Sequence, residues 1–259
     1  MGLFDSHSHL NDEKFDEDRE EQIKKIRESG VSNFITAGYS VESSKKALEI
    51  AKKYDFIYTT AGVSPNDIPQ TEEELWKQLA EIEKIVEKNK EKICAIGEIG
   101  LDYYWNTDNK ELQKKAFIEQ IKIANKYNLP IVIHTREAVM DTLQILKENK
   151  VTKTGVFHCC PQNRELIKEG LKLGFYISFA GPITFKNSKN AEEMINLVPN
   201  DRILIETDSP YLAPEPVRGT RNTPANVKYI AQKIADVKGL TLEEVEKITF
   251  ENTKNIFIY

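Results

Sequence analysis

Short apolar segments alternate with longer amphipathic segments along the whole chain, and this alternation restricts the fold more than any other feature. The apolar segments are rich in β-branched residues, which is typical of strands buried on both faces. The segments that predict strands are Leu3–Ser6, Val31–Ala37, Ile57–Ala61, Ile93–Ile96, Ile131–His134, Thr154–His158, Phe175–Phe179 and Ile203–Glu206. The sequence therefore predicts eight short, buried strands.

The segments between these strands carry apolar residues three and four positions apart, as amphipathic helices do. Gly30 is suited to end the first helix, and Thr241 with Glu244 forms a capping box that opens the last. The predicted helices are Asp18–Ser29, Val41–Tyr54, Glu72–Asn89, Asn109–Tyr127, Glu137–Lys147, Arg164–Leu173, Lys189–Val198 and Pro224–Val237, followed by one from Thr241. This order favours a parallel (β/α)₈ TIM barrel of the α/β class, with an open doubly wound sheet as the alternative.

Composition supports one domain spanning residues 1–259 and excludes several functional classes. No Gly-, Ser- or Pro-rich linker divides the chain, and a formal net charge of −5 argues against an extended basic surface for nucleic acid. No apolar run is long enough to span a membrane. The first residues lack the pattern of a signal peptide, and three cysteines give no disulfide framework. We expect a cytoplasmic monomer with no membrane contact.

All four histidines stand at the ends of predicted strands. His7 and His9 follow the first strand, and alternate residues of an extended chain point to the same side. His134 closes the fifth strand and His158 closes the sixth. Neutral imidazole is the commonest side-chain ligand for metals, so this placement predicts a metal centre.

Two carboxylates occupy matching positions: Glu98 follows the fourth strand and Asp208 follows the eighth. In a barrel, the C-terminal ends of all strands meet at one face, so six distant side chains are predicted to converge. A single histidine at a strand end is more often a hydrogen-bonded packing residue. Six polar residues together are hard to explain by packing, because uncompensated polar groups are costly there. The predicted ligands, which suit two ions sharing a carboxylate, are His7, His9, Glu98, His134, His158 and Asp208.

The chain resembles the TatD family of metal-dependent deoxyribonucleases, within the wider metallo-dependent hydrolase superfamily, over essentially its whole length. The motifs that carry the resemblance are Asp5–Leu10 (DSHSHL), Gly97–Tyr103 (GEIGLDY), Ile133–Ala138 (IHTREA), Ser178–Phe185 (SFAGPITF), Glu206–Leu212 (ETDSPYL), Arg221–Ala225 (RNTPA) and Asn252–Phe257 (NTKNIF). The resemblance implies a TIM barrel, a divalent-metal centre and hydrolysis of DNA, often as a 3′-to-5′ exonuclease on single strands.

The resemblance also implies how the ligands divide between two ions. His7, His9 and Asp208 would hold one ion, His134 and His158 the other, with Glu98 bridging the two. Members of the family commonly carry a His-Pro pair after the third strand that is thought to assist phosphate binding or protonation. Here Ser64 stands at that histidine's position, so Ser64 is a predicted substrate-binding residue.

The predicted mechanism uses a metal-bound hydroxide, because a divalent ion lowers the pKa of its water. Asp208 and Glu98 are the predicted catalytic residues, with Asp208 accepting the proton of that water. Arg221, in the Pro-rich loop 210–224, could grip a phosphate through its bidentate guanidinium. Tyr103, with Tyr104 and Trp105, could stack on a base or form a wall of the pocket.

Two questions stay open from sequence. The same ligands and fold also serve hydrolysis of an amide or ester of a small substrate, which is the alternative function. The ligand set admits two ions of zinc, manganese, iron or nickel, and magnesium is less natural with so many imidazoles. DNA, single-stranded in our interpretation, is the expected substrate.

Overall fold

The computed structural model describes residues 2–105 and 107–258 and contains one sheet of eight strands that curves into a barrel. Each strand pairs in parallel with the next one along the chain. The strands are β1 (Leu3–Ser8), β2 (Val31–Thr36), β3 (Ile57–Ala61), β4 (Ile93–Asp102), β5 (Ile131–Arg136), β6 (Gly155–Phe157), β7 (Tyr176–Phe179) and β8 (Ile203–Ile205).

Contacts between the first and last strands bring the two edges of this sheet together. The Ser6 hydroxyl donates to the carbonyl of Ile205 at 3.0 Å. Just beyond β8, the amide of Asp208 donates to the carbonyl of His7 at 3.0 Å, and the amide of His9 donates to the carbonyl of Ser209 at 2.7 Å. The predicted (β/α)₈ barrel is therefore confirmed, and the open sheet is excluded.

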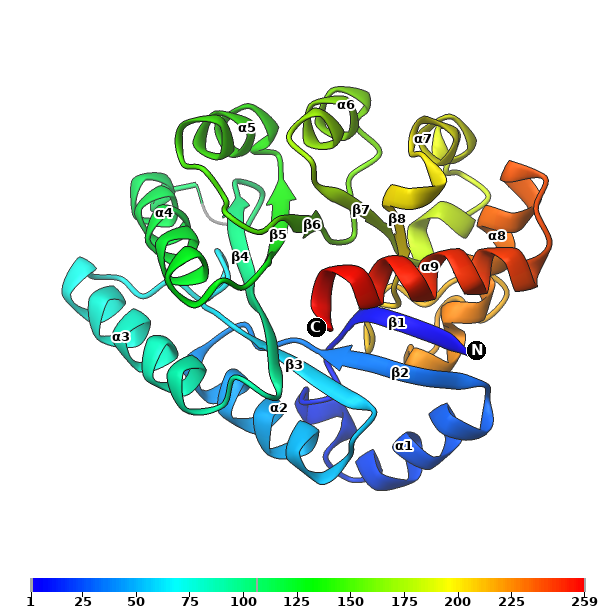
Figure 1. Ribbon diagram of the computed structural model, residues 1–259, viewed down its shortest axis with the longest axis horizontal. Helices are drawn as coiled ribbons and strands as arrows, with labels where there is room; N and C mark the ends of the chain where they lie inside the picture. Colours follow the sequence, from blue (N-terminus) through cyan, green and yellow to red (C-terminus); the bar gives the residue numbers. More distant parts are fainter. Residues whose placement is uncertain (1, 106, 259) are drawn as a thin grey trace.

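Helices surround the barrel and follow the strands in alternation (Figure 1). The α-helices are α1 (Arg19–Glu28), α2 (Val41–Lys53), α3 (Glu72–Lys88), α4 (Lys110–Tyr127), α5 (Val139–Glu148), α6 (Arg164–Lys172), α7 (Ala191–Leu197), α8 (Val227–Lys238) and α9 (Leu242–Phe257). Short 3₁₀ turns are η1 (Glu13–Phe15), η2 (Gly181–Thr184), η3 (Asn200–Arg202) and η4 (Pro224–Asn226). The predicted capping box of Thr241 and Glu244 opens α9. None of the helices described is long and apolar enough to cross a bilayer.

Helix α9 lies across one end of the barrel, and its last turn closes that end (Figure 1). Ile256 and Phe257, both at most 2% exposed, pack against side chains that point into the barrel. Those interior side chains are Phe4, Ile35, Cys94, Ala95, Val132, Val156 and Leu204. Most of these interior residues lie in the first halves of their strands or near the middle, and Ile35 lies close to the end of β2. The C-terminal strand ends are thus left to form the functional face.

Three strands extend beyond their predicted ends. β1 continues to Ser8, β4 to Asp102 and β5 to Arg136. The extended part of β4 pairs with β5 from Ile99 onward, after a register shift between Ile96 and Ile99 that marks a bulge. The polar residues His7, Glu98 and Arg136 of these extensions do not fit the apolar pattern of a strand interior, because they face the site rather than an apolar core.

Candidate metal centre

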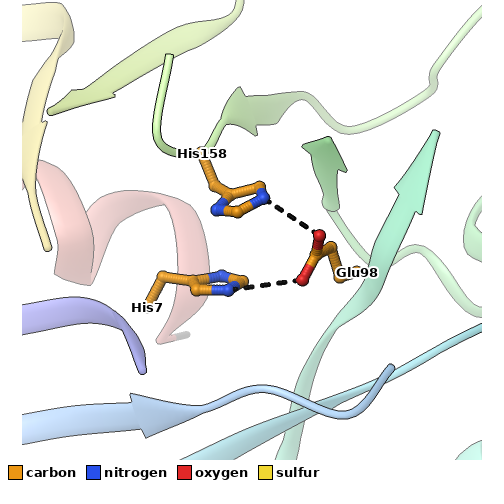
Figure 2. A group of neighbouring side chains, drawn as sticks. All are labelled: His7, Glu98 and His158. Atoms are coloured by element: carbon orange, nitrogen blue, oxygen red, sulfur yellow. Dashed lines mark ion pairs between the residues drawn. The ribbon is translucent and has the colours of Figure 1, made fainter. Parts of the chain in front are cut away.

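Four imidazoles and two carboxylates meet at the C-terminal ends of the strands. β1 supplies His7, with His9 just beyond it; β4 supplies Glu98 and β5 supplies His134. The other two lie beyond their strands: His158 follows β6 directly, and Asp208 lies three residues after β8. Figure 2 shows the Glu98 carboxylate between two of the rings, with one oxygen facing His158 and the other facing His7. The structure therefore brings together all six residues that the sequence singled out.

The local backbone explains how Glu98 reaches this position. The bulge in β4 spans Gly97 and Glu98, and bulges commonly redirect a side chain beside an active site. Gly100 then allows β4 to press against β5, since its φ is +136° and a Cβ there would lie 2.0 Å from the carbonyl oxygen of His134. A residue with a side chain could not occupy this position without moving His134.

The first group of donor atoms comprises His7, His9 and Asp208. The Nε2 atoms of the two imidazoles lie 3.2 Å apart. Asp208 Oδ1 lies 3.2 Å from His9 Nε2 and 3.7 Å from His7 Nε2. Glu98 Oε2 lies 3.6 Å from His7 Nε2 and 3.7 Å from His9 Nε2. Two imidazole nitrogens and two carboxylate oxygens thus surround a single position that one cation could occupy.

The second group uses the other oxygen of Glu98. Glu98 Oε1 lies 3.0 Å from His134 Nδ1 and 3.2 Å from His158 Nε2. The two imidazole nitrogens are 3.3 Å apart. The ring of His7 stacks on that of His158 with centroids 4.0 Å apart, so the two groups are adjacent and share Glu98.

These spacings fit divalent cations. Ligands about 2.0–2.1 Å from a tetrahedral ion lie about 3.3 Å from one another, which is close to the donor separations on both sides of Glu98. Pairs of imidazole nitrogens at such distances need a proton or a cation between them, because two lone pairs repel. The residues present can therefore hold two ions, with the three protein donors of the second group leaving room for a further ligand.

The pKa shifts of the clustered side chains show that the cluster attracts positive charge. Burial acts most strongly on Glu98 and raises its pKa, but the charge of His158 and hydrogen bonds from His134 and His158 hold that pKa well below its usual range. Burial likewise lowers the pKa of His158, yet Glu98 and Glu206 raise it well above its usual value. Without an ion, protons on imidazoles balance the carboxylates, and a divalent cation would displace those protons.

Further carboxylates orient the imidazoles, and the sequence did not single them out. Asp102 Oδ2 lies 2.9 Å from His134 Nε2, and Glu206 Oε1 lies 3.4 Å from His158 Nδ1. Both side chains are fully buried. Buried Asp5 receives hydrogen bonds from the amide and hydroxyl of Thr207, which fixes the segment leading to Asp208. The acidic residues in the DSHSH, GEIGLD and ETD motifs were the available signal, since outer carboxylates commonly orient histidine ligands.

A cavity of about 960 Å³ opens above the cluster. Its walls combine the cluster with aromatic, apolar and cationic side chains: His9, Asn66, Glu98, Trp105, His134, Thr135, Arg136, His158, Cys159, Pro161, Pro182, Asp208, Tyr211 and Leu212. Arg136 carries the positive charge of this wall, although no role was predicted for it from the sequence. Its position two residues after His134 on β5 was the available signal, because such residues face the same side of a strand.

The three residues predicted to bind substrate do not line this cavity. Arg221 forms an ion pair with Asp18 beside α1, and its guanidinium lies 4.8 Å from the ring centroid of Phe15. The buried Ser64 hydroxyl donates to Asp67 at 2.6 Å. The Tyr103 hydroxyl donates to Asp141 on α5 at 2.7 Å. Their contribution to substrate binding stays a prediction, and each side chain has a structural partner that accounts for its position.

Comparison with known proteins identifies the family. A model of TatD related DNases matches residues 4–258. The uncharacterized metal-dependent hydrolase YabD of Bacillus subtilis is 45% identical over 259 residues, covering 98% of each chain. The uncharacterized metal-dependent hydrolase YcfH of Escherichia coli K12 is 38% identical, covering 99% of this chain and 96% of its own.

A solved structure supports the fold. The crystal structure of YJJV, a TatD homologue from Escherichia coli K12, superimposes with a TM-score of 0.93 at 24% identity, covering 99% of this chain and 98% of that one. The family match over nearly the whole chain agrees with a cluster of imidazoles and carboxylates spaced for divalent cations. The chain therefore belongs to the TatD family and is a metal-dependent hydrolase.

Proposed function

We propose that this hydrolase is a deoxyribonuclease that cleaves phosphodiester bonds of single-stranded DNA from the 3′ end. Two divalent ions would be held by the six clustered side chains, one by His7, His9 and Asp208, the other by His134 and His158, with Glu98 shared. Bound ions of this kind stabilise the attacking and leaving oxygens and acidify a water molecule. The imidazole-rich set suits zinc, manganese, iron or nickel better than magnesium.

The side chains of the cluster have distinct tasks in this proposal. Glu98 directs one oxygen to each group and thereby fixes the distance between them. Asp208 lines the cavity, and a carboxylate that is ionised at neutral pH can accept the proton of the attacking water. Asp208 has a φ of +54°, which is uncommon for a residue other than glycine and is typical of positions held for a function.

One observation favours a phosphodiester over a neutral amide or ester. Arg136 lines the same cavity as the cluster, and a guanidinium binds the oxygens of phosphate through paired hydrogen bonds. A neutral substrate would gain little from this charge. The matching family, TatD related DNase, supports the same choice.

A digestion assay tests the proposal. End-labelled single-stranded DNA and a panel of amide and ester substrates are incubated with the protein in Mg²⁺, Mn²⁺ or Zn²⁺ separately. We expect metal-dependent release of nucleotides from the 3′ end, reduced at least a hundredfold by Asp208→Asn. Brisk turnover of an amide or ester with no cleavage of DNA would reject the proposal and establish the alternative hydrolase.

Exclusion of a contaminating nuclease needs a matched control. Asp201→Asn removes an exposed carboxylate that forms an ion pair with Arg202, and Asp201 does not line the cavity. This variant should retain the activity of the unmodified protein after identical purification. We also propose that the enzyme works as a monomer in a reducing cytoplasm. The free thiols of Cys94, Cys159 and Cys160 support the choice of compartment.

A further inference from the structure

Arg136 differs from the other arginines in what its guanidinium contacts. The chain has seven arginines, and the remaining six contact a carboxylate or a backbone carbonyl: Arg19, Arg27, Arg164, Arg202, Arg218 and Arg221. Within residues 2–105 and 107–258, no such partner is found for the guanidinium of Arg136. Arg136 lines the cavity, so its charge faces that space, and no anion among the described residues neutralises it.

Two exposed aromatic rings support this arginine. The guanidinium carbon of Arg136 lies 3.8 Å from the ring centroid of Tyr104 and 5.5 Å from that of Trp105. The two rings meet edge to face, with centroids 4.9 Å apart. Trp105 is 68% exposed and Tyr104 is 49% exposed, although large aromatic side chains are normally highly buried. Trp105 also lines the cavity.

The turn that carries these rings is fixed to the metal centre. Asp102 Oδ1 accepts hydrogen bonds from the backbone amides of Tyr104 at 2.9 Å and Trp105 at 3.1 Å. The other oxygen of Asp102 contacts His134. One buried carboxylate therefore sets both the orientation of a clustered histidine and the position of the exposed rings.

Arg136 also lies close to the clustered imidazoles and carboxylates of the metal centre. His134 and Arg136 are two residues apart on β5, so their side chains leave the same face of the strand about 7 Å apart. An extended ligand that places one group on the clustered residues can place the neighbouring group on Arg136 and Trp105.

We propose that Arg136, Tyr104 and Trp105 form a subsite for an unpaired nucleotide next to the scissile phosphate. The base stacks on the exposed indole, and the guanidinium binds the adjoining phosphate. A base inside a duplex has both faces covered, so this subsite selects single-stranded over double-stranded DNA. This inference rests on the proposed nuclease function. It adds the three residues that determine the preference for single-stranded over double-stranded DNA.

Tryptophan fluorescence tests binding without reference to turnover. The chain has two tryptophans, so Trp76→Phe leaves Trp105 as the sole reporter. Zn²⁺-loaded protein is titrated with a phosphorothioate-linked oligothymidylate, whose backbone resists hydrolysis. We expect saturable quenching of the Trp105 fluorescence. When Arg136→Met is combined with Trp76→Phe, binding should be about tenfold weaker. The same strand annealed to its complement should cause little quenching.

Kinetics provide the second measurement. Trp105→Ala should lower kcat/KM on single-stranded DNA by about tenfold, the size expected for loss of one stacked base. Arg136→Met should lower it by a similar factor, because the contact with the adjoining phosphate is lost. Trp105→Ala should not lower kcat/KM on bis-p-nitrophenyl phosphate by more than about twofold, since that diester carries no base. Arg164→Met, an exposed arginine paired with Glu193 on α7, is the charge-matched control and should leave both rates unchanged.

The outcomes separate this inference from the proposed function. Cleavage of DNA that is unaffected by Trp105→Ala and Arg136→Met, with no quenching, would overturn the subsite and leave the nuclease intact. Equal losses on both substrates in Trp105→Ala would also overturn it, because they indicate a general defect of the site. Quenching by single strands without any cleavage would support the subsite while rejecting the nuclease proposal.

Discussion

His134 differs from the other three histidines in the nitrogen that it turns toward Glu98. His7, His9 and His158 present Nε2, whereas His134 presents Nδ1. Its Nε2 lies 2.9 Å from Asp102, and a proton held there on the carboxylate side leaves the Nδ1 lone pair free for a cation. Asp102 thereby selects the tautomer that a metal centre needs.

We predict that Asp102→Asn weakens binding of one ion by about 10- to 100-fold. Asparagine offers a single acceptor oxygen, so it cannot serve both His134 and the amides of Tyr104 and Trp105. Calorimetric titration with Zn²⁺ measures the change. Asp141→Asn is the control, because Asp141 pairs with Lys114 and Tyr103 instead of a clustered histidine. Equal affinity in the Asp102 variant and the control would contradict the assignment.

The sequence could predict which side chains converge but not how each one is oriented. His7, His134 and Asp208 were found because barrel topology alone brings strand ends together. The use of Nδ1 by His134 depends on a rotamer and on the bulge at Glu98, neither of which leaves a periodic pattern. Arg221 was read from its residue type within a loop, and the structure engages it with Asp18.

The last turn of α9 contributes to stability at the end of the barrel opposite the metal centre. Phe257 is 2% exposed and packs with Ile256 against interior side chains such as Phe4 and Leu204. The same helix also has its Asn252 amide bound to the carbonyls of Asn200 and Ile203, which ties it to the start of β8. These contacts close the barrel without reaching the clustered histidines.

We predict that Phe257→Ala lowers the free energy of unfolding by about 3–5 kcal/mol, the usual loss for a buried phenylalanine. Urea unfolding measures the change. Activity per folded molecule should stay within about twofold of the unmodified protein, because the functional face lies at the other end. Leu173→Ala, at a side chain that is 37% exposed, should cost much less. A loss below about 1 kcal/mol would show that α9 does not seal the core.

Elements were predictable where an apolar pattern marks them. The apolar centres of β3, β5 and β7 and the amphipathic α2 and α3 appear where periodicity predicts them. The polar ends of β1, β4 and β5 were missed because their side chains serve the site. Pro224–Val237 was predicted as one helix, but the structure divides it into the 3₁₀ turn η4, which ends at Asn226, and the helix α8, which begins at Val227.

The metal centre joins distant parts of the barrel. His7 and Asp208 come from the β1 and β8 side of the sheet, whereas Glu98, His134 and His158 come from β4 to β6. The buried carboxylates of this cluster repel one another, and so do its imidazoles when they are protonated. The arrangement of these side chains therefore depends on whether protons or a cation lie between them. A cation bound by both sides would therefore act as a crosslink across the barrel mouth.

We predict that metal removal lowers the melting temperature of the whole molecule. A ligand that binds only the folded state at 100 times its Kd adds about 2.7 kcal/mol. For a chain of this size, each kcal/mol shifts Tm by about 2–4 °C, so chelation should lower Tm by about 5–10 °C. Scanning calorimetry with Zn²⁺ and with a chelator measures the shift. Asp208→Asn should retain only part of this shift, and the Asp141→Asn control should retain all of it. An identical Tm with and without metal would show that the six side chains bind no ion tightly, since linkage between binding and folding is obligatory.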